Sequence, residues 1–372
     1  MKTQLAQNFW REGLCWTIAV IIASISFSPD AGASSSLRLR MTPGSTSELM
    51  LSADLPDKDP QVQIYIQRFL TLGRVETEHA LGRAQYYFPM IEPYLQEAHL
   101  PNALKYLPLV ESTLLPGVIS PSGAAGIWQI MPSTADYFGL KITPALDERR
   151  DPHRSTQAAV SLLAMLHDQF CDWHLALAAY NCGPGRVRKA IRKAGTRNYD
   201  QLKAFLPLQT RNYISKFVAM AYVANHYDQY GLTPKYPADL SGPTQVLAIE
   251  GALNLEELAQ QSGAPLKTLR KLNPSYLSNQ LPPLKDQGRY LVYLPQEAVK
   301  NYYISLGKEE ALQQADHSQY LGPPLTAASL PTFTPPSVIG TGYHQPDLPA
   351  SPKRPRTLFS KYFIRRWPNG LA

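Results

Sequence analysis

The hydrophobic and polar positions between about residues 60 and 230 follow a helical pattern. Apolar residues recur there at steps of three and four, which places them on one face of each helix. The predicted helices cover, in chain order, about 61–70, 76–98, 103–111, 152–166, 173–181 and 210–230. No alternating pattern typical of a strand precedes residue 240. We therefore predict a mainly α protein whose largest domain, residues 59–235, is all-α.

Two of these helices have recognisable ends. Asp151 stands before Pro152, and Asp172 stands before the segment WHLALAAYN. Asp is a favoured N-cap because its side chain accepts from a free backbone N–H group, and Pro suits the first helical position. The segment GPG ends the second helix. The flanking Cys171 and Cys182 are then about 16 Å apart, beyond disulfide reach, so we expect two buried free cysteines.

A different pattern follows residue 243. A short apolar stretch, QVLAIEG, precedes two helical segments, NLEELAQQSG and PLKTLRKLNPSY, and a second strand-like stretch, RYLVYLP, closes the region. Strand, helix, helix and strand in such a short segment are typical of a small α+β module. We predict this module over residues 244–297.

The two ends of the chain differ from these regions. Residues 1–33 combine a basic start, a short apolar run and the small-residue site AGA, which is typical of a secretory signal peptide. An uncleaved membrane anchor is the alternative, although the run is shorter than the roughly 20 residues of a spanning helix. The polar residues 34–58 are expected to be a linker, and the Pro-rich residues 308–372 a disordered tail. The signal predicts export to the periplasm or cell envelope.

The formal charge of +7 is concentrated in the tail. Residues 351–372 hold six basic residues and no acidic ones, so the rest of the chain carries about +1. That low charge argues against nucleic acid as a partner. In the tail, TLFSKYFIRRW mixes aromatic and basic residues, which suits an anionic membrane surface. A plain disordered basic tail is the alternative.

Glu111 is the candidate for acid–base chemistry. It is the only acidic residue in PLVESTLLPGVISPSGAAGIWQIMPSTA, which covers residues 108–135. Desolvation disfavours a charged carboxylate, so a carboxyl group in such a setting can hold a proton near neutral pH, as a general acid must. The alternative is an ordinary glutamate at a helix end that faces solvent.

Two further segments can build a cleft around that acid. SGAAG allows close approach to the backbone, and IWQIMP then supplies Trp128, Gln129 and Met131 for stacking, amide and apolar contacts. AAYNCGPG places Tyr180 and Asn181 at a helix end. A loop followed by core residues, and a plain helix stop signal, are the alternatives.

Taken in order, LPLVES, SPSGAAGIWQIMPSTA, DERRDP, DWHLALAAYNCGPGRV and TRNYISKF resemble the Slt-type lytic transglycosylases, and most of all the membrane-bound lytic murein transglycosylase D group. The resemblance covers about residues 59–230 and implies a lysozyme-like helical domain. It also implies that Glu111 is the catalytic acid and base. The residues that it places at the substrate are Ser112, Ser120, Gln129, Met131, Tyr180, Asn181 and Tyr213. One departure is Gln209, where family members often have Glu.

The implied reaction cleaves the β-1,4 bond between N-acetylmuramic acid and N-acetylglucosamine in peptidoglycan and leaves a 1,6-anhydro end. Glycoside cleavage usually uses two carboxylates. Here Asp147, Glu148 and Asp151 read as structural acids, so Glu111 is left alone, and the substrate's own acetamido and C6 hydroxyl groups would supply the rest. A hydrolytic muramidase and a non-catalytic cell-wall-binding scaffold are the alternatives.

Residues 246–295 are similar to LysM-type modules, which bind glycans that contain N-acetylglucosamine. The alternative for this module is a domain that only braces the catalytic one. The resemblance implies no cofactor and no metal ion. Peptidoglycan glycan strands are the expected partner, the membrane surface is a possible partner of the tail, and the chain is expected to be a monomer.

Overall fold

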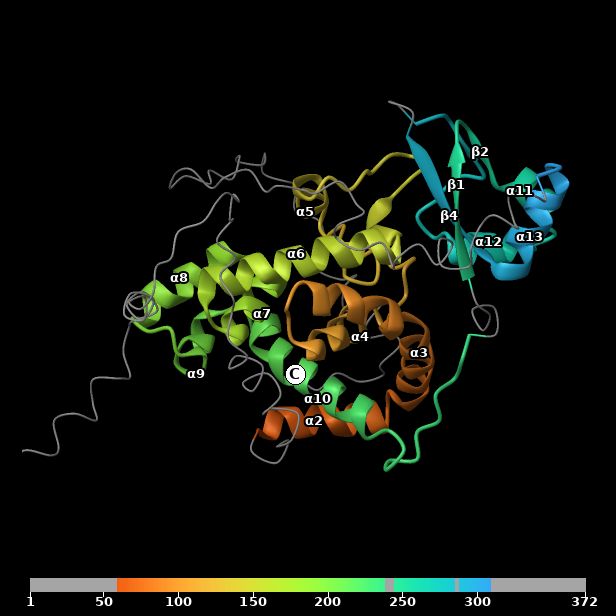
Figure 1. The fold of residues 1–372 in the computed structure, drawn as a ribbon. Coiled ribbons are helices and arrows are strands. Elements are labelled where there is room, and N and C mark those ends of the chain that lie inside the picture. The colour runs from red at the N-terminus through yellow and green to blue at the C-terminus, as the bar shows by residue number, and fades with distance from the viewer. Residues whose placement is uncertain (1–58, 238–243, 285–287, 309–372) are drawn as a thin grey trace, which may run out of the picture. The chain divides into compact units, whose positions relative to one another are not determined.

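Figure 1 shows the chain as a computed structural model, which describes residues 59–237, 244–284 and 288–308. The predictions of a signal, a linker and a tail cover residues 1–58 and 308–372, and all of these residues except Lys308 lie outside the described residues. Among the described helices, none combines the length and the apolar character that crossing a membrane requires.

The region before residue 238 is helical, and the predicted mainly α fold is confirmed. Its helices are α2 (Pro60–Leu70), α3 (Arg74–Glu97), η3 (Asn102–Tyr106), α4 (Leu107–Ser112), α5 (Pro132–Tyr137), η4 (Glu148–Arg150), α6 (Pro152–Phe170), α7 (Trp173–Cys182), α8 (Pro184–Ala194), α9 (Tyr199–Leu202), η5 (Lys203–Phe205) and α10 (Leu208–Asn225). In Figure 1, α2 and α10 run side by side, and α10 also packs against α7 and α4. α10 therefore contacts α2 and α7 as well as α4, the helix that carries Glu111.

Three helix predictions need correction. The helix expected over 103–111 is split into a 3-10 turn, η3, and the short α4, which has Pro108 in its first turn. The GPG segment ends α7 as predicted, but α8 starts at Pro184 and was missed, because the same Gly-Pro pair stops one helix and starts the next. α10 ends at Asn225, five residues earlier than predicted, and a turn follows it.

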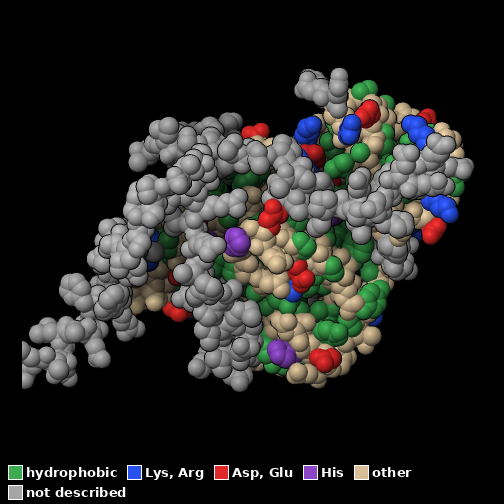
Figure 2. Space-filling model, viewed as in Figure 1, with side chains coloured by type: hydrophobic (Ala, Val, Ile, Leu, Met, Phe, Trp, Pro, Cys, Tyr) green, Lys and Arg blue, Asp and Glu red, His purple; other side chains and the backbone are tan. Residues whose placement is uncertain are grey.

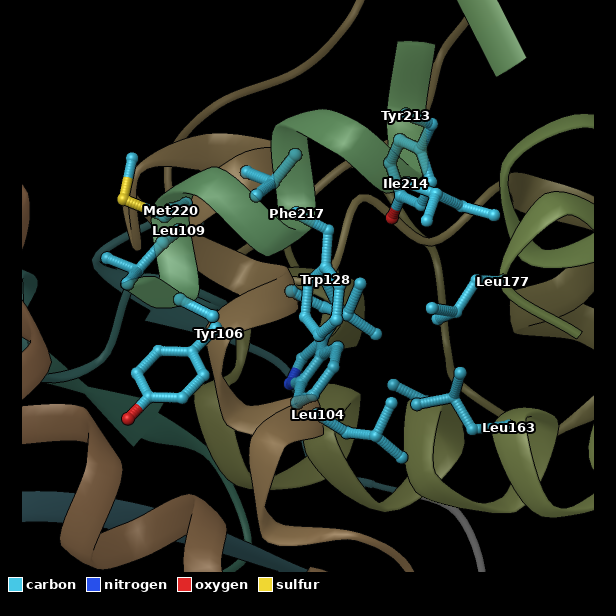
Figure 3. Close-up of a cluster of buried hydrophobic side chains, with 14 of the residues drawn as sticks. Leu104, Tyr106, Leu109, Trp128, Leu163, Leu177, Tyr213, Ile214, Phe217 and Met220 are labelled. Atoms are coloured by element: carbon cyan, nitrogen blue, oxygen red, sulfur yellow. The ribbon is translucent and has the colours of Figure 1, made fainter. Parts of the chain in front are cut away.

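Trp128 lies at the centre of the hydrophobic core rather than in a cleft. It is fully buried, and its indole N–H donates to the Thr156 hydroxyl at 2.8 Å. Figure 3 shows it packed among side chains from η3 and α10, including Leu104 and Phe217. The stacking contact expected of this residue is therefore wrong, and the alternative of a core position holds. A buried tryptophan needs a partner for its N–H group, and Thr156 supplies it.

The second region has the predicted α+β composition. β1 (Thr244–Glu250) pairs antiparallel with β4 (Arg289–Pro295), and the helices α11 (Leu255–Ser262) and α12 (Leu266–Leu272) lie between them in sequence. The short strands β2 (Leu253–Asn254) and β3 (Gln280–Leu281) form a second pair, and an unpredicted helix, α13 (Gln296–Ser305), follows β4. These elements enclose their own apolar cluster.

Asn273 ties the helices of this module to its sheet. The side chain is 2% exposed, and its amide donates to the carbonyl groups of Leu269 and Tyr293 at 2.8 Å each. Its carbonyl oxygen accepts from the Tyr293 N–H group, also at 2.8 Å. One buried side chain thus satisfies polar groups of α12 and β4, as a stable polar group in a core requires.

The segment before η4 contacts this module through backbone groups. Leu146 forms a bridge with Tyr276, and the Asp147 N–H group donates to the Ser275 carbonyl at 2.9 Å. Leu146 also belongs to the apolar cluster of the module. The module therefore shares apolar core with Leu146 and a backbone hydrogen bond with the start of the DERRDP segment.

Cys171 and Cys182, the two cysteines in the described part of the chain, are free, as predicted. Cys182 is buried, but Cys171 is exposed, so the prediction of a buried residue is wrong for Cys171. Cys171 follows α6 with a φ of 48°, and this C-terminal cap position faces solvent rather than the core.

The described surface carries both signs of charge. On the part of the face that Figure 2 leaves uncovered, basic and acidic side chains lie interspersed, without a broad basic patch. This pattern agrees with the low net charge expected outside the tail.

Candidate active site

Glu111 occupies the end of α4 with apolar neighbours on both sides. Leu109 and Val110 before it and Leu114 after it are buried, whereas Glu111 itself keeps partial access to solvent. The residue is thus partly exposed, although protein surrounds its carboxyl group. Burial therefore raises the pKa of the Glu111 carboxyl group, as expected when the charged form loses water.

Tyr213 binds the carboxyl group directly. Its hydroxyl donates to Glu111 Oε1 at 2.5 Å, across 102 positions of sequence, because α10 packs against α4. This hydrogen bond lowers the pKa of Glu111 and opposes the effect of burial. Burial and the neighbouring Glu111 charge hold the pKa of Tyr213 well above 10, so the phenol keeps its proton and remains a donor.

The chain turns sharply after α4. Thr113 and Leu114 both have positive φ values, 54° and 59°, a conformation that costs non-glycine residues about 1–3 kcal/mol each and is often found at functional sites. Arg83 of α3 holds this turn, since its Nε donates to the Thr113 carbonyl at 2.7 Å while its guanidinium pairs with Glu76 at 3.3 Å. Arg83 of α3 thus supports the turn that follows Glu111.

Ser112 points into the protein. It is 4% exposed, and its hydroxyl donates to the Ile127 carbonyl at 2.8 Å. That bond connects α4, which carries Glu111, with the glycine-containing segment that follows. Ser112 is thus close to the site in sequence, but its hydroxyl is used within the protein.

The glycines of the SGAAG segment permit a close backbone approach, as predicted. Gly126 has a φ of 83°, and a Cβ atom there would lie 1.8 Å from the Arg149 carbonyl oxygen. No side chain fits at that distance. Arg149, which forms a buried ion pair with Asp147 at 2.7 Å, also donates to the Gly123 carbonyl at 2.6 Å. The DERRDP segment is therefore a support for this loop.

Gln129 also has an unusual backbone, with a φ of 49°. Its amide nitrogen donates to the carbonyls of Gly126 and Val118, at 2.9 Å and 3.2 Å, and so closes the loop on itself. Met131 is 39% exposed at the start of α5. Ser120 accepts from the Ala124 N–H group at 3.0 Å. These predicted residues all lie in one short loop.

The end of α7 supplies the other two predicted residues. The Tyr180 hydroxyl donates to the Trp128 carbonyl at 2.7 Å, and the charge of Glu111 is near enough to raise the pKa of this tyrosine further. Asn181 accepts from the Thr210 hydroxyl at 2.9 Å, which joins α7 to the first turn of α10. Tyr180 and Tyr213 therefore lie around Glu111, while Asn181 binds to the helix that carries Tyr213.

The other acids of the region are used by the structure. Asp147 pairs with Arg149, Glu148 lies 3.5 Å from Arg154, and Asp151 accepts from two backbone N–H groups at the start of α6. Among the described residues, no group of three or more His, Cys, Asp or Glu side chains could hold a metal ion. Glu111, in contrast, is partly exposed and accepts a hydrogen bond from the neutral Tyr213 hydroxyl.

Sequence reasoning missed one charged residue of this site, Lys216. Its ammonium group lies near Glu111 and lowers the pKa of that carboxyl group. The available signal was its spacing, since residues three apart on a helix lie on one face and Tyr213 is three positions earlier. We return to this residue below.

Two protein families match this chain. The family described as transglycosylase SLT domain matches residues 88–203, and the family described as lytic transglycosylase MltD, LysM-like domain, matches residues 244–311. Two successive parts of the chain are therefore similar to an SLT domain and to a LysM-like domain of that type, which confirms the resemblance found in the sequence. The region that matches the SLT domain is helical and the region that matches the LysM-like domain is α+β, as expected.

Individual relatives cover part of the chain. Membrane-bound lytic murein transglycosylase D of Escherichia coli (strain K12) is 35% identical over 195 residues, which are 51% of this chain and 43% of that protein. Soluble lytic murein transglycosylase of the same strain is 33% identical over 127 residues, 32% of this chain and 19% of that protein. The chain thus spans less than half the length of these two relatives. Among solved structures, the 70 kDa soluble lytic transglycosylase of Escherichia coli is 27% identical, with a TM-score of 0.34, over 41% of this chain and 26% of that one.

Proposed function

We propose that this chain is a lytic transglycosylase that cleaves the β-1,4 bond between N-acetylmuramic acid and N-acetylglucosamine in peptidoglycan. The observation that carries the proposal is the environment of Glu111, a partly exposed glutamate whose carboxyl pKa is raised by burial and which accepts from Tyr213. The SLT domain match and the lytic transglycosylases among the relatives support the same substrate.

The proposed reaction uses one carboxyl group twice. Glu111 first donates its proton to the glycosidic oxygen, the bond from C1 to that oxygen breaks, and the N-acetylglucosamine hydroxyl leaves. The 2-acetamido group of the muramic acid stabilises the positive charge at C1. The Glu111 carboxylate then accepts the proton of the C6 hydroxyl, whose oxygen bonds to C1. The product is a 1,6-anhydro ring, and no water is consumed.

The remaining residues have proposed roles that follow from their positions. Tyr213 orients the carboxyl group through its hydrogen bond, and Tyr180 limits the space beside it. Asn181 is proposed to orient the acetamido group. The loop residues Gln129, Met131 and Ser120 would contact neighbouring sugars, and Ser112 supports that loop from below through Ile127.

The competing function is hydrolysis by the same site. Water, rather than the C6 hydroxyl, would then attack C1, and the product that carries the new muramic acid end would be heavier by one water molecule. We expect mass spectrometry of fragments released from purified peptidoglycan to find muramic acid ends in the anhydro form. Reducing ends with the added water would establish the hydrolytic muramidase instead. Absence of any released fragment, from folded protein, would favour the non-catalytic scaffold.

The LysM-like domain is proposed to bind the glycan strand. We expect the chain with the substitution Glu111→Gln, which prevents digestion, to sediment with insoluble peptidoglycan, and the same chain truncated after residue 243 to sediment several times less. If the domain only braces its neighbour through Leu146 and Tyr276, the truncated chain will instead bind as well as the full chain but melt at a lower temperature.

The proposed location is the cell envelope, on the periplasmic side. This site of action follows from the substrate and from the signal-like residues 1–33. Contact of the basic tail with a membrane surface remains a prediction that lies outside the described residues.

A further inference from the structure

Lys216 is a charged residue in the interior of the site. It lies on α10, one turn after Tyr213, and is only partly accessible. Its ammonium group donates to the carbonyl of Val110 at 3.1 Å, and Val110 is the residue before Glu111 on α4. The same helix therefore contacts both the side chain of Glu111, through Tyr213, and the backbone beside it, through Lys216.

Burial of a lysine ammonium group costs free energy unless a nearby opposite charge offsets the loss of water. Burial lowers the pKa of Lys216 to about 8, while the negative charge of Glu111 acts in the opposite direction and favours the ammonium form. In return, the positive charge of Lys216 lowers the pKa of Glu111. Each of the two charges therefore favours the charged form of the other group.

The other titratable groups around α10 do not substitute for this charge. Tyr180 from α7 and Tyr213 have pKa values well above 10 and stay neutral. Burial also raises the pKa of the Cys182 thiol. From α2, Asp59 accepts from the Ser215 hydroxyl at 3.0 Å, and from η3, Lys105 pairs with Glu92 at 2.6 Å.

We propose that Lys216 is a positioning residue that stabilises the carboxylate form of Glu111 during each catalytic cycle, an inference that rests on the function proposed above. When Glu111 gives its proton to the glycosidic oxygen, a negative charge forms in a desolvated site, and the fixed ammonium group offsets it. Lys216 keeps its own proton throughout. The proton that leaves Glu111 returns to it from the C6 hydroxyl, so the lysine takes no part in the proton balance.

The direction of the effect on pH dependence follows from these charges. Glu111 must begin each cycle protonated, so activity falls as the pH rises through its pKa. Lys216 lowers that pKa, and removal of its charge will raise it. The alkaline limb of the profile of kcat/KM will therefore move to higher pH in Lys216→Met, while the maximal kcat falls because the developing carboxylate is less stabilised. An opposite charge at close range typically changes a carboxyl pKa by about 1–3 units.

The test uses the full chain with 13C-labelled glutamate carboxyl groups and follows the Glu111 signal by NMR as the pH is varied. The signal is assigned by its absence in Glu111→Gln. We expect the midpoint of Glu111 to rise by at least about one unit in Lys216→Met, which matches lysine in length without the charge, and to stay close to the wild-type value in Lys216→Arg. Lys203→Met removes an exposed lysine that pairs with Asp200, and should leave the midpoint unchanged.

An unchanged midpoint in folded Lys216→Met overturns the inference, as does an equal shift in Lys216→Met and Lys216→Arg, because either result reduces Lys216 to a structural role. Should Lys216→Met fail to fold, Lys216→Arg and Lys216→Gln decide the question, since only the second lacks the charge. The titration midpoint of Glu111 is measured by NMR without any turnover of substrate. The two proposals can therefore fail separately, since an active Glu111→Gln variant would reject the proposed function and would not affect this measurement.

Discussion

Replacement of Glu111 by glutamine is expected to reduce the cleavage of purified peptidoglycan by roughly a hundredfold or more. Glutamine matches the shape of the side chain and can still accept from Tyr213, but it can neither donate nor accept the proton that both steps need. The measurement is the initial rate of fragment release, together with a thermal melt to verify that the variant is folded.

Glu97 provides the matched control for this substitution. It is an exposed glutamate at the end of α3, and Glu97→Gln is expected to retain the wild-type rate. Near-normal activity of a folded Glu111→Gln variant would contradict the assignment of the acid. Another group would then have to act as the general acid.

Replacement of Tyr213 by phenylalanine is expected to lower kcat by about ten- to a hundredfold, since a hydrogen bond to a charged group is worth about 1.5–3 kcal/mol. The phenol donates to Glu111 and favours its carboxylate form, so its loss raises the pKa of Glu111. Activity that falls with rising pH will then fall at a higher pH than in the wild type. The profile of kcat/KM against pH measures both effects.

Tyr106→Phe is the control for this second substitution. Tyr106 donates to the Asn225 side chain at 2.8 Å, so the variant loses a hydrogen bond of the same domain at a distance from the acid. We expect lower stability and an unchanged pH profile. If Tyr213→Phe behaves in the same way, its hydroxyl supports the fold rather than the carboxyl group.

Glu111 and Tyr213 differ in how far the sequence alone identifies them. Glu111 is identifiable from local sequence because it is the one acid in a long apolar stretch, and a desolvated carboxyl group is unusual whatever the fold. Tyr213 has no such local signature, and it was identified through the family resemblance. That Tyr213 touches Glu111 depends on how α10 packs against α4, which no spacing within either helix determines.

The glycine-containing loop shows a similar division. The sequence predicts a close backbone approach at SGAAG, because only glycine lacks the Cβ atom that would prevent it. It does not identify the partner, which is the Arg149 carbonyl of a distant segment. Trp128 and Ser112 illustrate the same difficulty, since a tryptophan and a serine suit a cleft as well as a core, and only the packing around them places both inside.

By itself the sequence determined the helical domain, the small α+β module, the capping residues Asp151 and Asp172 and the isolated acid Glu111, because periodicity, capping and charge are properties of neighbouring residues. The tertiary structure decided the contacts of Glu111 with Tyr213 and Lys216, the support of its turn by Arg83, and the inward direction of Ser112. Each of these depends on the approach of segments far apart in the chain. Such an approach depends on the packing of the whole domain rather than on any local pattern.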